Sequence, residues 1–406
     1  MKCITLAYGA EEPLVLEVDD DALVADCRGP AGVIGEAART LVTAAVAATA
    51  LGPPLELHVV PGDRVVIGLA GDVPQAVEVV TAVAERLIAS GVEPADITVL
   101  HAPALDGASA GTSPPLAIPP EMGTVAVFDP TAEPQTSYVD ADEAGRPIHL
   151  ARLLVDADVV VGVGSWGWDA AFGGRSIEGE LWPTFSRKSC RQELVRALAK
   201  RGRRALAPWR MSNHEATWRL GMCASLRVIV GRGGTLAAAA FGLPDGVAEN
   251  ARTLAAGWSP LVKGVALTTI ASLSDPRGGL AMLLRAVSAA ARVTHPTGTV
   301  CIASRLAERP GVIFARWREG APLDALVREA VGTGDQALIN DAFQTRFFAR
   351  ALGERRLVLL SDLDEATVEE LELGFAAKPE VVERLAHRSD SVVVMHEADR
   401  MLPRVL

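Results

Sequence analysis

Short apolar runs alternate with longer stretches of helical periodicity along most of this chain. The run from Val159 to Val163 is apolar throughout, as a strand buried on both faces requires. The segment 75–90 instead repeats valine and leucine at helical spacing and stops at Gly91. Strands that alternate with helices become parallel neighbours through right-handed crossovers.

The same alternation, followed from end to end, predicts the elements of an α/β protein. Predicted strands cover 2–7, 13–18, 64–70, 97–101, 124–128, 159–163, 226–230, 264–268, 299–303, 357–360 and 391–395. Predicted helices cover 34–50, 75–90, 148–156, 188–200, 213–221, 244–256, 279–291, 367–371 and 379–386, with further helices between 307 and 355. The Pro-, Gly- and Ser-rich segment 102–122 predicts a long irregular loop.

The chain of 406 residues is long enough for two domains. We predict an α/β fold with domains 1–255 and 256–406, each a largely parallel sheet flanked by helices. Clefts between domains are the usual place for a small-molecule ligand. We therefore expect the functional site in an inter-domain cleft.

Composition narrows the classes of partner. Hydrophobic residues make up 49% and charged residues 22% of the sequence, which fits a globular protein. A net charge of −11 argues against nucleic acid and anionic membranes as partners, because both reward basic surfaces. The five cysteines are scattered and odd in number, which predicts neither a disulfide framework nor a thiolate zinc site. We expect a cytoplasmic protein whose oligomeric state the sequence leaves open.

The segment 158–188 holds the most informative local pattern. A buried strand is followed by glycines, by Trp166 and Trp168, and then by Gly173 and Gly174. Glycines after a strand let the backbone turn sharply and approach a ligand, and tryptophans offer broad apolar faces. This pattern predicts the floor of a binding site, and an ordinary glycine-rich connection fits it about as well.

Several charged residues fall at the ends of predicted strands, where side chains reach a cleft. His101 ends one strand, and Asp72 follows another in GDVP, where it could equally cap the next helix. Arg175, beside the two glycines, could receive a carboxylate with its planar fork of donors. Arg285 follows SDPRGG on a predicted helix and could point into the cleft from the other domain. Packing or solvation explains each residue taken alone, and only their shared position favours a site.

Local sequence motifs exclude several familiar chemistries. The chain has no Walker A motif, no GxSxG and no HExxH, and its seven histidines show no i, i+4 pairing. A metal site built from a local motif is therefore not predicted.

The order of longer segments resembles the nickel-pincer-dependent lactate racemase family over almost the whole chain. The resemblance is carried by AYG…PLVLEV (7–18), PGDRVVI (61–67), FDP (128–130), AGRPIHLARLLVDADVVVGVGS (144–165), GGRS (173–176), SNHEAT (212–217), AFGLPDGVAENAR (240–252), SDPRGGLAMLLRAV (274–287) and PTGTVCIAS (296–304). It implies a two-domain racemase of 2-hydroxy acids. The family holds a nickel–pincer nucleotide tethered to lysine and ligated by histidine, with two further histidines as acid and base.

Carried over residue by residue, the resemblance implies a changed site. The tethering lysine falls on Arg175 or Ser176, and neither can form the linkage. The histidine of the loop falls within 167–169, where none is present, and the next falls near Arg191. The family's Asp-x-Thr-Arg-Pro becomes AGDVP (70–74), which keeps Asp72 and Pro74. Its histidine after the third strand is matched only by a displaced His101, and its cleft lysine corresponds to Arg285.

Three functions remain open from the sequence. The first is a lactate racemase-like racemase or epimerase of a small 2-hydroxy acid. The second is a non-catalytic protein that binds a small anion in the same cleft. The third is an enzyme of other chemistry in which Asp72, His101 or Asp169 does acid–base work. The predicted catalytic residues are Asp72, His101, Asp169 and Arg285. The predicted cofactor-binding residues are Trp168, Gly173, Gly174, Arg175 and Ser176, for a cofactor that the sequence does not identify.

Overall fold

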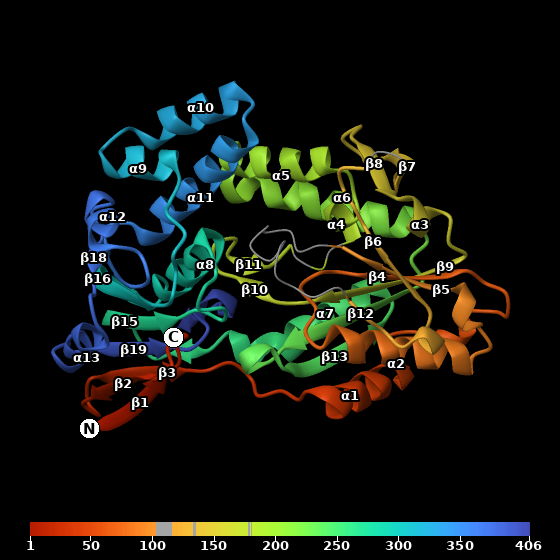
Figure 1. Ribbon diagram of the computed structural model, residues 1–406, viewed down its shortest axis with the longest axis horizontal. Helices are drawn as coiled ribbons and strands as arrows, with labels where there is room; N and C mark the ends of the chain where they lie inside the picture. Colours follow the sequence, from red (N-terminus) through yellow and green to blue (C-terminus); the bar gives the residue numbers. More distant parts are fainter. Residues whose placement is uncertain (103–115, 133–134, 178, 180) are drawn as a thin grey trace.

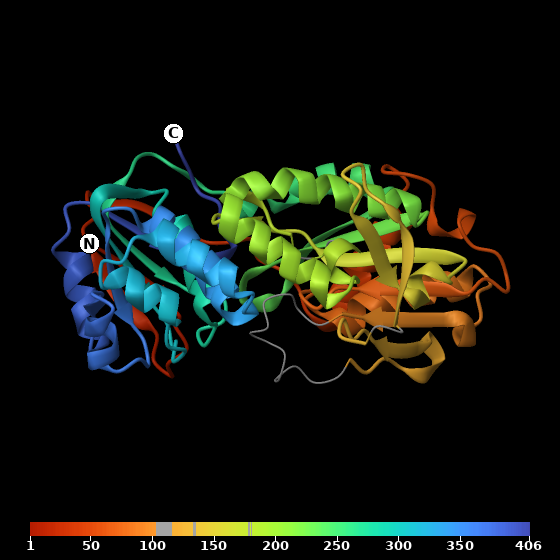
Figure 2. The ribbon, with the colours of Figure 1, turned by 90° about the horizontal axis from the view of Figure 1, so that it is seen from above.

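The protein forms two lobes that lie side by side (Figure 1). The computed structural model describes residues 1–102, 116–132, 135–177, 179 and 181–406. Each lobe is built on one six-stranded sheet, and four two-stranded pairings accompany them in the described part of the chain. The view from above shows the same two bodies along the long axis (Figure 2). Of the predicted loop 102–122, residues 103–115 lie outside the described residues.

The first lobe is organised on the strand order β13-β12-β9-β4-β5-β6. Five of these strands are parallel, and β13 runs antiparallel at the edge. Helices α1 and α2 pack on one face of the sheet, and α3 to α6 lie over the other. The bounds are α1 Gly35–Ala47, β4 Val65–Leu69, α2 Ala76–Ala89, β5 Ile97–His101, β6 Thr124–Val127, β7 Thr136–Ala141, β8 Pro147–Ala151, α3 Arg152–Val155, β9 Val159–Ser165, α4 Leu181–Thr184, α5 Lys188–Arg201, α6 Leu206–Arg219, β12 Ala224–Val230, β13 Leu236–Gly242 and α7 Pro244–Leu254.

The second lobe is organised on the wholly parallel order β18-β17-β16-β15-β19-β3. The N-terminal hairpin β1–β2 and α13 cover one face, where Leu6 and Leu16 are buried against Ile270 and Val394. The bounds are β1 Lys2–Leu6, β2 Leu14–Val18, β3 Leu23–Cys27, β15 Ala266–Ser272, α8 Leu280–Ala290, β16 Thr294–Ala303, α9 Val312–Arg318, α10 Leu323–Thr333, α11 Gln336–Leu352, β17 Arg356–Leu360, α12 Glu365–Glu370, β18 Gly374–Phe375, α13 Pro379–His387 and β19 Val392–Met395.

The fold class agrees with the prediction, since both lobes are parallel-dominated sheets flanked by helices. The division at residues 255 and 256 stays a prediction about independent domains. The strand pairing also shows a feature that the sequence did not predict: the N-terminal strand β3 joins the sheet of the second lobe, beside β19. The chain therefore crosses between the lobes twice, once after Cys27 and again near Trp258. No helix among the described residues combines the length and apolar character of a membrane span.

One predicted helix, 148–156, is wrong in its first half. Residues Pro147–Ala151 form β8, which pairs with β7, and only Arg152–Val155 is helical. Ile148 and Leu150 are buried while His149 between them is half-buried, and this is the period of a strand. The segment is too short for its period to be separated from a helix without its pairing partner.

Trp258 fixes the place where the two crossings meet. Its ring is 2% exposed, and its Nε1 donates a hydrogen bond to the carbonyl of Val230 at 2.6 Å. The backbone of Gly29, on the first crossing, lies against the ring, so that a Cβ built there would be 2.2 Å from it. Leu402 near the C-terminus donates its N–H to the carbonyl of Trp258 at 2.9 Å.

We expect Gly29→Ala to lower the free energy of unfolding by about 1–3 kcal/mol, because the new methyl group overlaps a buried ring. The matched control is Gly332→Ala in α10, where no atom lies within 4 Å of the added Cβ. Alanine in a helix should leave stability unchanged or raise it by up to about 1 kcal/mol. Urea unfolding of the three proteins measures both effects. Equal stability of Gly29→Ala and the natural protein would contradict this role of Trp258.

Candidate ligand-binding site

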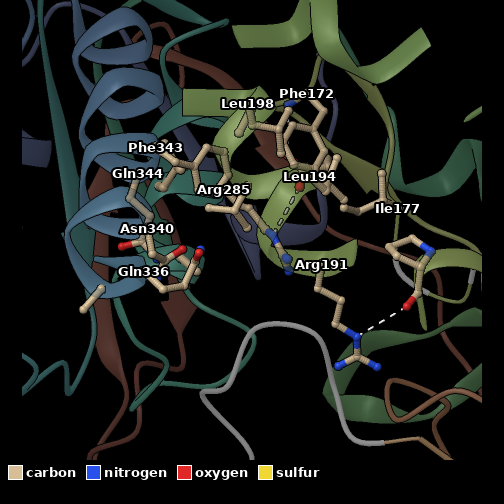
Figure 3. Close-up of a pocket in the computed structure, with 17 residues that line it drawn as sticks. Phe172, Ile177, Arg191, Leu194, Leu198, Arg285, Gln336, Asn340, Phe343 and Gln344 are labelled. Carbon is tan, nitrogen blue, oxygen red and sulfur yellow. Dashed lines mark hydrogen bonds and ion pairs between the residues drawn. The ribbon is translucent and has the colours of Figure 1, made fainter. Parts of the chain in front are cut away.

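A cavity of about 390 Å³ lies between the lobes. Its first-lobe wall comes from α5, from Pro183 and from four residues of the segment before α4, namely Asp169, Ala171, Phe172 and Ile177. Its second-lobe wall comes from α8 and α11. Apolar side chains make up much of the lining, including Phe172, Leu194, Leu284 and Phe343. Polar groups enter from both lobes (Figure 3). An apolar cavity with a few convergent polar groups is the usual form of a small-molecule site.

An ion pair joins the two lobes inside this cavity. Nε of Arg285 on α8 lies 3.2 Å from Oδ2 of Asp169, whose side chain is 2% exposed. The backbone N–H of Phe172 also donates to Oδ1 of Asp169 at 3.1 Å. Asp169 is placed by the short hairpin of β10 (Trp168–Asp169) and β11 (Gly174–Arg175). The structure thus brings together two residues predicted from separate parts of the sequence.

Arg191 supplies the second guanidinium of the cavity lining. It lies one turn into α5 and is half-buried. Its donors reach two backbone carbonyls of α4, Pro183 at 3.4 Å and Thr184. Burial lowers the pKa of Arg191 below its usual value. No carboxylate of the described residues forms an ion pair with it.

Three amide side chains complete the polar lining. Gln336, Asn340 and Gln344 recur every four residues on α11 and therefore share one face of the helix. Asp335 is the N-cap of this helix, and its carboxylate accepts hydrogen bonds from the backbone N–H groups of Ala337 and Leu338. The sequence analysis missed these amides. Their spacing of four residues on one helix was the available signal, but only the packing of α11 against the cavity shows that this helix face lines a site.

The predicted cofactor-binding residues lie beside the cavity, and none of them is among its lining. Trp168 is half-buried and donates its indole N–H to the carbonyl of Ala255 at 2.9 Å. It meets Trp166 edge to face, with ring centroids 4.8 Å apart. The backbone N–H of Ser176 donates to Gly167 at 2.9 Å, and Arg210 donates to the carbonyl of Arg175 at 2.6 Å. These contacts hold the hairpin in place.

The two glycines of the same segment behave differently. Gly173 has a φ of +71°, in the region that favours glycine, and a Cβ there would lie 3.0 Å from Nη1 of Arg203. Gly174 pairs with Asp169 across the hairpin and has open space beside it. Gly173 therefore permits the turn that positions Asp169. Binding of a cofactor by these glycines, and by Trp168, Arg175 and Ser176, stays a prediction.

Asp72 and His101 lie at another place, the carboxyl edge of the first-lobe sheet. Strand order reverses between β4 and β9, and such switch points are the usual crevices of open α/β sheets. Asp72 follows β4 there and accepts a hydrogen bond from Ser165 at the end of β9. Burial raises the pKa of Asp72, against that hydrogen bond, and its Oδ1 is buried without a partner. His101 ends β5, is half-buried, and has its pKa lowered by burial.

The sequence analysis also missed that Gly162, Gly164 and Gly167 spell GxGxxG at the end of β9. A dinucleotide fingerprint needs a helix directly after this turn, because the helix N-terminus receives the pyrophosphate. Here the β10–β11 hairpin follows instead. A Cβ at Gly164 would lie 2.7 Å from the carbonyl oxygen of Gly179, so close backbone packing accounts for this glycine.

The described residues do not fit a covalently tethered pincer nucleotide. The described part of the cavity lining contains no lysine and no histidine, and Arg191 lies near the position where the resemblance places the second site histidine. A guanidinium stays protonated and presents no lone pair to a metal. No group of three or more His, Cys, Asp or Glu among the described residues could hold a metal ion. We derive no step through this group.

We expect the single substitutions Asp169→Asn and Arg285→Gln each to destabilise the protein. Removing one partner of a buried pair leaves an uncompensated charge, which costs about 2–4 kcal/mol here because Arg285 keeps 18% exposure. The double variant should be more stable than the sum of the single losses predicts. Urea unfolding of the four proteins completes the cycle, and strictly additive losses would contradict a direct pairing.

Asp72→Asn should change how stability depends on pH. The pKa of Asp72 is higher in the folded protein than in the unfolded chain, so a proton on Asp72 favours the folded state. This stabilisation is complete below the pKa of the unfolded chain, and it is lost as the pH rises through the pKa of the folded protein. Asparagine does not titrate, so the variant does not lose stability in this way, and its amide oxygen can still accept the hydrogen bond from Ser165. Its stability relative to the natural protein should therefore increase from pH 4 to pH 7 in urea titrations. A difference that is constant with pH would contradict the raised pKa.

Known proteins resemble this chain in structure and not in sequence. No protein-family model matches the sequence, and no curated protein is found as a sequence relative. The structure is similar to that of the lactate racemase apoprotein from Thermoanaerobacterium thermosaccharolyticum, with a TM-score of 0.76 and 16% identity over 99% of this chain and 100% of that one. It is also similar to a crystal structure of a Thermotoga maritima protein, with a TM-score of 0.61 and 12% identity over 91% and 98% of the two chains.

At these identities the comparisons show the fold alone. The lactate racemase apoprotein matches from end to end, so both lobes and their connection belong to one shared architecture. The site residues carry no such support, because 16% identity does not fix individual positions. The chain has a lactate racemase-like fold.

Proposed function

We propose that the inter-lobe cavity receives a small 2-hydroxy acid, or a carboxylate like it, and that the protein acts on this acid as a racemase or epimerase. The observation that carries the proposal is Arg191, a half-buried cation in the cavity with no ion-pair partner among the described residues. Burying a charge is costly unless it is paired. A ligand carboxylate would supply that pairing.

The rest of the lining suits the other parts of such a ligand. Guanidinium and carboxylate match as planar, bidentate partners. The amides of Gln336, Asn340 and Gln344 can both donate and accept, which suits a hydroxyl group next to the carboxylate. Phe172 and Phe343, whose rings stack at 6.5 Å, offer an apolar wall to a short carbon chain. Arg285, held by Asp169, adds positive potential from the second lobe.

The racemase or epimerase assignment comes from the similarity in fold to the lactate racemase apoprotein. Inversion at carbon requires one group to take a hydrogen and another to return it to the opposite face. Asp169 is the single carboxylate of the described lining, which holds no histidine or lysine. This composition favours a second candidate function, binding of the carboxylate without turnover. The two candidate functions share the same cavity and the same bound anion.

Calorimetric titration with the two enantiomers of lactate and a panel of longer 2-hydroxy acids tests the binding. We expect Arg191→Gln to weaken binding about tenfold or more, the usual loss for one charge-assisted hydrogen-bonded contact. The matched control is Arg196→Gln, a half-buried arginine on the same helix that lines a different cavity. It should bind as the natural protein does.

Chiral chromatography of the same acids after incubation tests the reaction. Interconversion that is lost in Arg191→Gln supports a racemase or epimerase. Binding without interconversion supports the second candidate. Binding that Arg191→Gln and Arg196→Gln weaken equally would reject the cavity as the site, and so would the absence of binding by every acid in the panel.

A further inference from the structure

A second, smaller cavity of about 210 Å³ also lies between the lobes. It lies behind the hairpin that carries Asp169, and Ala171 lines both cavities. Four arginines line it, Arg203 from the first lobe and Arg292, Arg350 and Arg355 from the second. No aspartate or glutamate is among the described residues that line it. In a chain of net charge −11, this concentration of positive charge is local and unusual.

Backbone carbonyls, and no carboxylates of the described residues, hold three of these arginines in place. Arg203 donates to Ala171 at 2.6 Å and to Ala170 at 2.9 Å. Arg292 donates to Pro403 at 2.9 Å. Arg355 donates to Thr294 from Nε at 3.0 Å and from Nη2 at 2.9 Å. Neutral acceptors fix the direction of a guanidinium without cancelling its charge, so the positive potential of the cavity remains.

The charges repel one another across the boundary between the lobes. The pKa of Arg203 is lowered first by burial and then by the charges of Arg350 and Arg292, and the nearby Asp169 carboxylate offsets this only in part. Burial also lowers the pKa of Arg355. Arg350 and Arg292 are exposed, so the cavity opens to solvent and an ion can enter it. The folded arrangement therefore holds like charges together at a cost that a bound anion would remove.

Ser288 provides an independent observation at the same place. Its side chain is 4% exposed and lines the cavity from α8. Its Oγ is buried and has no hydrogen-bond partner. A buried hydroxyl without a partner is uncommon and costs free energy, so each case calls for an explanation. An acceptor oxygen bound in the cavity would satisfy it.

We propose that this cavity, lined by Arg203, Ser288, Arg292, Arg350 and Arg355, is a binding site for a phosphate group, either as inorganic phosphate or as a phosphate monoester. Phosphate carries close to two negative charges and several strong acceptor oxygens. Arginine forks match its geometry, and a serine hydroxyl can donate to a remaining oxygen. The volume suits one such group and a small substituent.

Phosphate bound here would hold the lobes together. It would contact Arg203 of the first lobe and the other three arginines of the second, and it would replace their repulsion by attraction. Because Ala171 is shared with the larger cavity, phosphate would also stabilise the segment that carries Asp169 and Phe172. This site does not depend on the function proposed for the larger cavity.

Calorimetric titration and thermal unfolding with inorganic phosphate and with glycerol 3-phosphate test the proposal. We expect saturable binding and a rise in Tm that potassium chloride at equal ionic strength does not reproduce. Arg350→Ala should weaken binding about tenfold or more, and Ser288→Ala severalfold. Both variants should fold, because Arg350 is exposed and the Oγ of Ser288 has no hydrogen-bond partner among the described residues. Arg328→Ala, at an exposed arginine on α10 outside the cavity, is the matched control and should bind normally.

The relative affinity of the two probes separates the sources. Tighter binding of inorganic phosphate assigns the site to the free ion, and tighter binding of glycerol 3-phosphate assigns it to a phosphorylated metabolite. Arg191→Gln should leave both affinities unchanged, so this test can fail independently of the proposed function. Three results would overturn the proposal: no saturable binding, equal losses in Arg350→Ala and Arg328→Ala, or tighter binding of malonate than of either phosphate.

Discussion

The ion pair between the two lobes is the interaction on which the arrangement of both cavities depends. The ion pair of Asp169 and Arg285 crosses the boundary and is nearly buried, so the two lobes must meet there in one arrangement. Around it the balance is positive, with Arg191 on one side and the group of Arg203, Arg292, Arg350 and Arg355 on the other. The short β10–β11 hairpin lies between these groups and shapes both cavities.

This arrangement explains why the framework and the chemistry of the site can be considered separately. The sheets, the helices and the junction at Trp258 are held by apolar burial and by backbone hydrogen bonds that need no ligand. At the boundary, Arg191 has no ion-pair partner and the Oγ of Ser288 has no hydrogen-bond partner among the described residues. A fold shared with the lactate racemase apoprotein can therefore carry a different set of groups in its cleft.

Much of the fold could be predicted because its periods are local. The apolar runs of β4 and β9 and the helical spacing of α2 can be recognised within single segments, and β5 was predicted with its observed bounds. The failures are segments whose conformation depends on a partner. Strand β8 needs β7, β3 joins β19 across more than three hundred residues of sequence, and the alanine-rich β13 has weak strand propensity and depends on pairing with β12.

The sequence by itself determined the α/β class, because the apolar periods of strands and helices are local features. It also predicted Asp169 and Arg285 as site residues, and their role stays a prediction. Only the tertiary structure decided which of these residues share a cavity. It separated Asp72 and His101 from Asp169, and it placed Trp168, Gly173 and Arg175 in a supporting hairpin. The tertiary structure also placed Arg203 and Arg350 in the lining of one cavity. The physical reason is that a site is defined by distances between side chains from different elements, and these follow from packing of the two lobes.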